Sequence, residues 1–235
     1  MRPCLTVHLG LMEYGEAWAL QKALVLSRAE GITPDLLLLL EHPPTYTIGR
    51  RGDRSHILLP AERLQETGIA LYETDRGGQA TYHGPGQVVG YPILDLRGWM
   101  GPLQYTRTLE ALLIETVQAL GVPGGRVEGL TGVWVGERKI AAIGVRISRG
   151  VAFHGFALNV DPNLRPFDFI VPCGIRDKGV TSLAQELGRP VEVEEVLPIL
   201  TEAFARAFDF ALRWARPEEW EALRGALPAM PEVVR

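Results

Sequence analysis

Cys173 is the residue best placed to act as a nucleophile, because it stands between a proline and a glycine. These neighbours favour a turn, which would expose the thiol. A catalytic thiol needs a nearby cation or base that favours the thiolate, and His83, His154 and Lys139 are the candidates. A lone cysteine is more often a buried hydrophobic residue, and Cys4, in an alternating apolar segment, fits that role better.

A glycine-rich segment, residues 76–87, surrounds His83 and reads Arg-Gly-Gly-Gln-Ala-Thr-Tyr-His-Gly-Pro-Gly-Gln. Four glycines and a proline in twelve residues argue against a helix or an ordinary strand. Such backbone occurs where a ligand approaches the main chain or where tight turns are required. The segment leads into an apolar strand, and this combination predicts a binding site.

Lys139 is one of three lysines among 24 basic residues, the others being Lys22 and Lys178. A lysine kept in an arginine-rich chain suggests that a titratable amine is needed. The alternative is a charge at the exposed edge of a strand.

Hydrophobic periodicity predicts an α+β (α/β) domain spanning residues 1–235, with a mixed, largely antiparallel sheet and helices to one side. No linker or repeat divides the chain. Helices are expected at 14–30, 60–67, 103–120, 191–210 and 217–223. Strands are expected at 4–9, 35–41, 45–49, 69–73, 88–96, 131–135, 139–148 and 151–160.

The last two strands should form a hairpin through Arg149-Gly150. Gly144 then faces Gly155 and Ala142 faces Ala157, all on one side of the sheet. Opposed glycines weaken a sheet, so another group should occupy the space. Either a helix packs closely there, or the space is a narrow channel for a slim apolar chain.

The composition limits the possible functions. A net charge of −4 argues against nucleic-acid binding, although residues 126–180 hold eight basic against five acidic side chains and could receive an acidic partner. No 18-residue apolar run or signal-peptide core is found, so no membrane association is expected. Two cysteines fit a reducing cytoplasm, and the lack of CxxC or HExxH argues against a metal site.

Four ordered motifs resemble the lipoyl(octanoyl) transferase family. They are residues 76–87, Lys-Ile-Ala-Ala-Ile-Gly-Val (139–145), His-Gly-Phe-Ala-Leu-Asn (154–159) and Pro-Cys-Gly-Ile (172–175). The family shares the fold of biotin and lipoate protein ligases. Its members move an octanoyl group from acyl carrier protein to a lysine of lipoyl domains, a step of lipoate biosynthesis.

The resemblance implies a catalytic pair, Cys173 and Lys139, with His83 in a supporting role. It implies no cofactor. The acceptors would be the lipoyl domains of 2-oxoacid dehydrogenase complexes and the glycine cleavage H protein. The substrate-binding residues would be Arg76, Gly77, Gly78, Gln79, Ala80, Thr81, Tyr82, His83, Ala142, Ile143, Gly144, Gly155, Phe156 and Ala157.

One conflict follows from the strand pattern. On a regular strand Lys139 points away from the face that carries Ala142 and Gly144. A bulge near Lys139, or an acyl chain that runs past the strand end, would remove the conflict. Two other readings stay open: an ATP-dependent lipoate or biotin protein ligase of the same fold, and a non-catalytic protein that binds lipoyl domains or acyl carriers.

Overall fold

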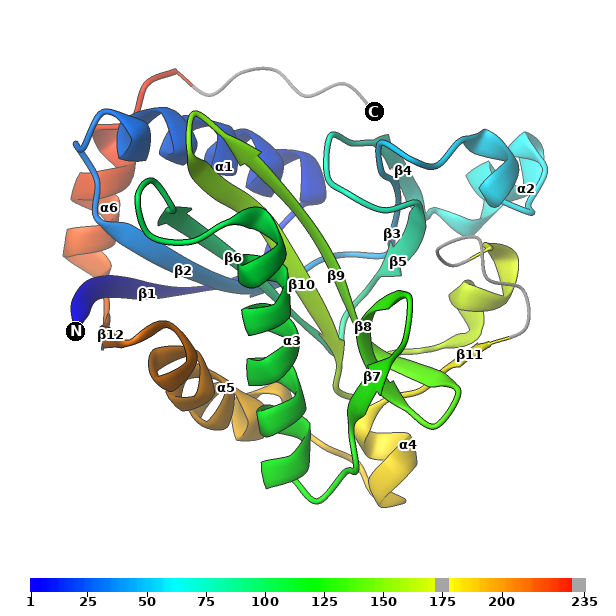
Figure 1. Cartoon of the computed structure of the whole chain (residues 1–235). Helices are drawn as coiled ribbons and strands as arrows, with labels where there is room; N and C mark the ends of the chain where they lie inside the picture. Colours follow the sequence, from blue (N-terminus) through cyan, green and yellow to red (C-terminus); the bar gives the residue numbers. More distant parts are fainter. Residues whose placement is uncertain (172–177, 230–235) are drawn as a thin grey trace.

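The computed structural model describes residues 1–171 and 178–229, so Cys173 lies outside the described residues. A large mixed sheet crosses the molecule in the strand order β12-β1-β2-β6-β10-β9-β8-β7, with β11 beside β9. A small sheet, β4-β3-β5, lies next to it (Figure 1). Most strand pairs are antiparallel, as predicted, and the parallel pairs are β1 with β2 and β12, β9 with β11, and β3 with β4.

The strands of the large sheet are β1 (Arg2–Leu11), β2 (Asp35–Glu41), β6 (Gln87–Asp95), β7 (Gly125–Val127), β8 (Leu130–Val135), β9 (Arg138–Ser148), β10 (Val151–Asn159), β11 (Gly179–Val180) and β12 (Phe210–Trp214). Those of the small sheet are β3 (Thr45–Ile48), β4 (Ala70–Glu73) and β5 (Ala80–His83). The helices are α1 (Tyr14–Ala29), α2 (Ala61–Thr67), α3 (Pro102–Ala119), α4 (Leu183–Leu187), α5 (Val193–Phe208) and α6 (Pro217–Gly225). Two short 3-10 turns occupy Arg54–His56 and Arg165–Phe169. No described helix is long and apolar enough to cross a membrane.

Helices cover both faces of the large sheet, so the prediction of helices on one side is wrong. Strand β2 shows the reason, since its run of leucines is buried throughout. Leu37 and Leu39 belong to a core that also contains residues of α3 and α5, whereas Leu36, Leu38 and Leu40 pack in a second core with α1. Successive strand side chains point to opposite faces, so an unbroken apolar run requires cover on both.

The β9–β10 hairpin has the predicted register. Gly155 pairs with Gly144, and Ala157 pairs with Ala142. The turn residues Arg149 and Gly150 have φ angles of 52° and 79°. Positive φ at both central positions is the signature of a type I′ turn, whose twist matches that of the flanking strands.

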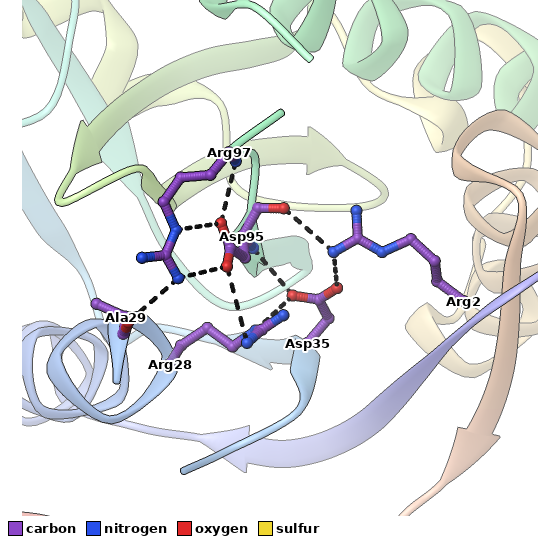
Figure 2. Close-up of polar contacts among 6 residues, drawn as sticks. All are labelled: Arg2, Arg28, Ala29, Asp35, Asp95 and Arg97. Atoms are coloured by element: carbon purple, nitrogen blue, oxygen red, sulfur yellow. Dashed lines mark hydrogen bonds and ion pairs between the residues drawn. The ribbon is translucent and has the colours of Figure 1, made fainter. Parts of the chain in front are cut away.

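A cluster of ion pairs fixes the end of the sheet near the N-terminus (Figure 2). The buried Asp35 carboxylate accepts hydrogen bonds from Arg28 Nε at 2.7 Å, Arg2 at 2.8 Å and the Asp95 backbone N–H at 2.9 Å. Arg97 binds the carboxylate of Asp95. The cluster links β1, β2, β6 and α1. None of its residues belongs to the four family motifs, so its role is structural.

Two further predictions of secondary structure are wrong. The glycine-rich segment contains a true strand, β5, which pairs with β3. The helix expected to reach residue 210 ends at Phe208, because Asp209 adopts a left-handed φ of 53°. The chain then forms β12, which the hydrophobic pattern did not reveal and which pairs in parallel with β1.

Candidate active site

Arg76 holds the glycine-rich segment in shape. Arg76 is 7% exposed, and its guanidinium donates to the carbonyl oxygens of Thr47, Gly77 and Gln79 at 2.7–2.9 Å, and to the Thr47 hydroxyl. The segment is thereby tied to β3. A second anchor is the Glu41 carboxylate, which accepts the Gly86 N–H at 2.6 Å.

The segment crosses the β9–β10 hairpin at the opposed glycines. The Gly77 N–H donates to the Val145 carbonyl at 3.0 Å. A Cβ atom at Gly144 would lie 2.8 Å from the Gly77 carbonyl oxygen, and one at Gly155 would lie 2.1 Å from the Gly90 oxygen. Both positions therefore require glycine, because another stretch of backbone lies directly against each of them. The sequence left open that a helix packs against these glycines, and no described helix does so.

A pocket of about 470 Å³, open solvent at its mouth included, lies where the segment meets the hairpin. We call it the main pocket. It brings together eleven of the predicted binding residues with three others that the site prediction omitted. It is lined by Arg76, Gly78, Ala80, Thr81, His83, Ala142, Ile143, Gly144, Gly155, Phe156 and Ala157, and by Tyr14, Tyr91 and His154.

The predicted binding residues do not all serve the main pocket in the same way. Ile143 and Phe156 border it, but their side chains pack in the core shared with α3 and α5. Tyr82 and Gln79 line neighbouring pockets instead. Gly77 lines none of these three cavities, and the close approach to the hairpin is what it provides.

Lys139 lies beside this pocket because β9 carries a bulge. Val133 pairs with Ala141 but Trp134 pairs with Lys139, so one extra residue of β9 is accommodated between them. A bulge of one residue reverses the side-chain parity of the strand before it. Lys139 therefore shares a smaller cavity, the lysine pocket, with Ala142 and Ala157, and the conflict noted from the sequence is resolved.

The Lys139 side chain is held in an aromatic and glycine-lined space. It is 8% exposed, and its ammonium nitrogen lies 4.7 Å from the centre of the Trp134 ring. Gly132, with φ of 122°, leaves room beside the aliphatic part of the lysine, since a Cβ there would lie 3.4 Å from Lys139 Cε. The alternative of an exposed charge at a strand edge is wrong.

A series of three hydrogen bonds connects residues that line the lysine pocket to the backbone of Lys139. Gln87 donates to Asn159 at 2.8 Å, and Asn159 donates to the Thr181 carbonyl at 2.8 Å. The Thr181 N–H in turn donates to the Lys139 carbonyl at 3.0 Å. Three motifs that are far apart in the sequence are joined in this way, and the backbone of Lys139 is fixed at the end of the chain of contacts.

His83 is a neutral imidazole. It is 6% exposed, and burial, together with the neighbouring His42 and Arg76, holds its pKa well below the usual value. It stacks on Tyr14 with ring centres 5.8 Å apart. His83 is therefore not the cation that would stabilise a thiolate, and a role in positioning remains the prediction for it.

His154 borders the main pocket in an unusual backbone conformation. Its φ is 54°, and its N–H donates to the Gln21 side-chain oxygen at 2.7 Å instead of to a neighbouring strand. Its Nε2 lies 2.7 Å from Asp75, which also pairs with Arg146 at 2.7 Å. Burial lowers the pKa of His154 despite the carboxylate.

The sequence indicates the three pocket residues that the site prediction omitted with different strength. His154 opens the motif at 154–159 and is one of the candidate bases, so its sequence signal is clear. Tyr91 follows the glycine-rich segment in β6, which is a weak signal. Tyr14 comes from α1, and nothing in its local sequence distinguishes it from a core residue.

The structure describes one of the two cysteines, Cys4. Cys4 is buried in the core, and burial raises the pKa of its thiol, so it is the inert hydrophobic residue predicted. Cys173 is outside the described residues. The described chain resumes at Lys178, and Val180 in β11 pairs with Lys139.

Comparison with known proteins identifies the family. Residues 13–205 match the Lipoyl protein ligase A/B catalytic domain. Proteins named octanoyltransferase are similar along nearly the whole chain. That of Solibacter usitatus is 51% identical over 90% of this chain and 96% of its own length, and that of Gloeobacter violaceus is 52% identical over 88% and 91%.

Solved structures show the same fold. A lipoate-protein ligase A bound with ATP superposes with a TM-score of 0.78 at 19% identity, covering 96% of this chain and 93% of that one. Biotin protein ligase from Aquifex aeolicus reaches 0.52 at 13% identity, covering 89% and 70%. The predicted mixed sheet of the biotin and lipoate ligase type is thus confirmed, and the chain belongs to the octanoyltransferase family, within the lipoyl protein ligase A/B catalytic domains.

Proposed function

We propose that this chain transfers an octanoyl group from acyl carrier protein to a lysine of a lipoyl domain, through a thioester on Cys173. The family membership supports octanoyl transfer as a step of lipoate biosynthesis. One observation of the structure carries the proposal most directly. The main pocket is walled by Ala142, Gly144 and Ala157, and it adjoins the cavity that holds Lys139.

The first half-reaction exchanges one thioester for another. The Cys173 thiolate attacks the octanoyl carbonyl, the bond to the carrier sulfur breaks, and the carrier thiolate takes up a proton. Because a thioester is both consumed and formed, the step is near thermoneutral and needs no ATP. The Lys139 ammonium stabilises the Cys173 thiolate before attack and supplies a proton to the leaving thiolate.

The second half-reaction forms an amide. The acceptor lysine's amine attacks the Cys173 thioester, the sulfur leaves as thiolate, and the amine loses a proton. Lys139 in its neutral form receives that proton and returns to the ammonium form. The position of Lys139 supports this role, because its pocket shares Ala142 and Ala157 with the main pocket, where the acyl chain would lie.

Chain connectivity supports the pairing of Cys173 with Lys139. Val180 lies against Lys139 in β11, and Cys173 precedes it by only seven positions in the sequence. The described chain on the other side ends at Val171, whose N–H donates to the His56 carbonyl at 2.9 Å. The described chain is thus held on both sides of the segment that contains Cys173, and on one side it is held next to Lys139.

A third cavity of about 670 Å³, open solvent included, also borders Lys139. Its lining is polar and includes Arg51, Gln79 and Thr131. We expect the thioester arm of acyl carrier protein to enter here first. The acceptor proteins would then bind at the same opening; they are the lipoyl domains of 2-oxoacid dehydrogenase complexes and the glycine cleavage H protein. We further propose that residues 1–235 act as one catalytic domain in the cytoplasm.

Intact mass spectrometry tests the covalent step. The protein is incubated with octanoyl-acyl carrier protein, with and without ATP. We expect an adduct of one octanoyl group that is independent of ATP and lost in Cys173→Ser. Cys4→Ala is the matched control and should keep the adduct. ATP-dependent use of free octanoate without any adduct would favour a ligase and overturn the proposal.

Lys139→Arg tests the acid–base role. Arginine keeps the positive charge but does not release a proton near neutral pH. We expect the adduct to form slowly and transfer to the lipoyl domain to fall by about 10²-fold or more, the usual contribution of a general acid or base. Normal turnover by this variant would show that Lys139 has no such role.

A further inference from the structure

The main pocket ends on polar groups, away from Lys139. The lysine pocket and the main pocket share Thr81, Ala142 and Ala157, which marks the place where the two cavities meet. Tyr91 and His154 border the main pocket alone. Strand pairing puts both at the end away from Lys139, since His154 pairs with Val145 and Tyr91 follows Gly90, the partner of Phe156.

The length of the hairpin agrees with an eight-carbon chain ending near His154. His154 pairs with Val145, six positions after Lys139, and one of those positions is taken up by the bulge. The remaining five correspond to about 16 Å of strand. The side chains of Lys139 and His154 each shorten that gap, and an extended octanoyl group of about 9 Å fits what is left.

His154 presents a hydrogen-bond acceptor that nothing described in this chain satisfies. The Asp75 carboxylate can only accept, so the Nε2 atom of His154, 2.7 Å away, carries the proton. Burial lowers the pKa of His154, so the ring is neutral and Nδ1 keeps a lone pair. Among the described residues that buried Nδ1 atom has no hydrogen-bond partner.

Tyr91 is also an acceptor toward the pocket. His42 Nδ1 lies 2.7 Å from the Met12 carbonyl, which can only accept, so that nitrogen carries the proton. Burial lowers the pKa of His42 to about 4, so the ring is neutral and Nε2 accepts the Tyr91 hydroxyl at 2.7 Å. The Tyr91 proton is used there, and only oxygen lone pairs remain for a ligand.

His83 adds a third polar atom to the same cavity. Its Nδ1 is buried and likewise without a partner within residues 1–171 and 178–229. A buried acceptor that is left unpaired, as His154 Nδ1 is, is costly, so a donor is expected at this end when the pocket is filled. A methyl group, the end of an octanoyl chain, cannot supply one.

We propose that this end of the main pocket is a hydroxyl-binding subsite, and that medium-chain acyl groups with a terminal hydroxyl are a second class of donor substrate. With an octanoyl chain, a water molecule supplies the hydroxyl. With an 8-hydroxyoctanoyl chain, the substrate's own O–H donates to His154 Nδ1. The inference rests on the proposed function, because it places the acyl chain in this pocket.

Competition between two isosteres tests the subsite in the unmodified protein. The pantetheine thioesters of nonanoate and 8-hydroxyoctanoate differ only in a terminal methyl or hydroxyl. Both are supplied together with a lipoyl domain, and chromatography of the remaining thioesters gives the ratio of their kcat/KM values. A satisfied hydrogen bond predicts about fivefold preference for the hydroxyl. An apolar end would prefer nonanoate by about 100-fold.

Equal use of the two thioesters, or any preference for nonanoate, would overturn the proposal. His154→Phe assigns the effect to the residue, since it keeps a ring and removes both nitrogens; the preference should then pass to nonanoate. The exposed His8→Phe is the matched control and should leave the ratio unchanged. The ratio in the unmodified protein decides the proposal even where His154→Phe does not fold.

Failure of the subsite and failure of octanoyl transfer are distinguishable. Absence of octanoyl transfer would refute the proposed function alone. Calorimetric binding of the free acids to the full chain would then test the subsite, with 8-hydroxyoctanoate expected to bind about fivefold more tightly than nonanoate. Equal or weaker binding of the hydroxy acid would refute the subsite by itself.

Discussion

Ala142 offers the sharpest test of where the acyl chain lies. It borders both the main pocket and the lysine pocket, so the proposed mechanism requires the acyl chain to pass it. Ala142→Leu adds three carbon atoms at this junction. The added side chain occupies space that three methylene groups of the octanoyl chain would otherwise fill.

The magnitude follows from the apolar area lost. Burying one methylene group contributes about 0.8 kcal/mol, so displacing three costs about 2.4 kcal/mol. That energy corresponds to about a sixtyfold loss in kcat/KM for octanoyl transfer. A pentanoyl donor, three carbons shorter, should lose less, so the octanoyl-to-pentanoyl ratio should fall.

The assay is octanoyl and pentanoyl transfer to a lipoyl domain, with folding checked by calorimetry. Ala211→Leu is the matched control, since it makes the same substitution at an exposed position of β12. A folded Ala142→Leu protein that loses less than fivefold in octanoyl kcat/KM would show that the chain does not run through this junction.

Three further predictions concern the supporting structure. Gly132→Ala should cost about 1–3 kcal/mol and slow adduct formation, because φ is 122° and the new Cβ would lie 2.6 Å from the Ala141 oxygen; an unchanged melting temperature would contradict this. Asn159→Ala should destabilise by about 1–3 kcal/mol, seen in urea unfolding, because it leaves buried partners unpaired; exposed Asn163→Ala should not. The hydrogen bond from Arg97 lowers the pKa of Asp95 from 3.8 to about 2. The ionised Asp95 therefore stabilises the folded protein above pH 4, and this contribution is lost toward pH 2. Arg97→Ala should be less stable than the unmodified protein at pH 6 but not at pH 2.

Local patterns predicted the hairpin because its register depends only on neighbouring residues. The two-residue turn at Arg149-Gly150 fixes the pairing, and alternation then puts Ala142, Gly144 and their partners on one face. The predicted binding segments converge on the main pocket for the same reason. Their small residues mark places where backbone passes close to backbone.

Some elements depended on contacts that no local pattern encodes. Strand β12 is short and half exposed, and it exists because β1 offers a free edge to pair with. Strand β5 forms among glycines because β3 supplies its hydrogen bonds. In both cases tertiary pairing outweighs a local preference for loop or helix.

The sequence by itself determined the family motifs, the hairpin register and the small-residue wall, because each follows from residue types at fixed spacing. Only the tertiary structure decided which way Lys139 points, since the bulge arises from pairing with β8. It also decided the polar end of the pocket, where His154, Tyr91 and Tyr14 come from three separate elements. Burial there sets their protonation, and burial is a property of the packed molecule alone.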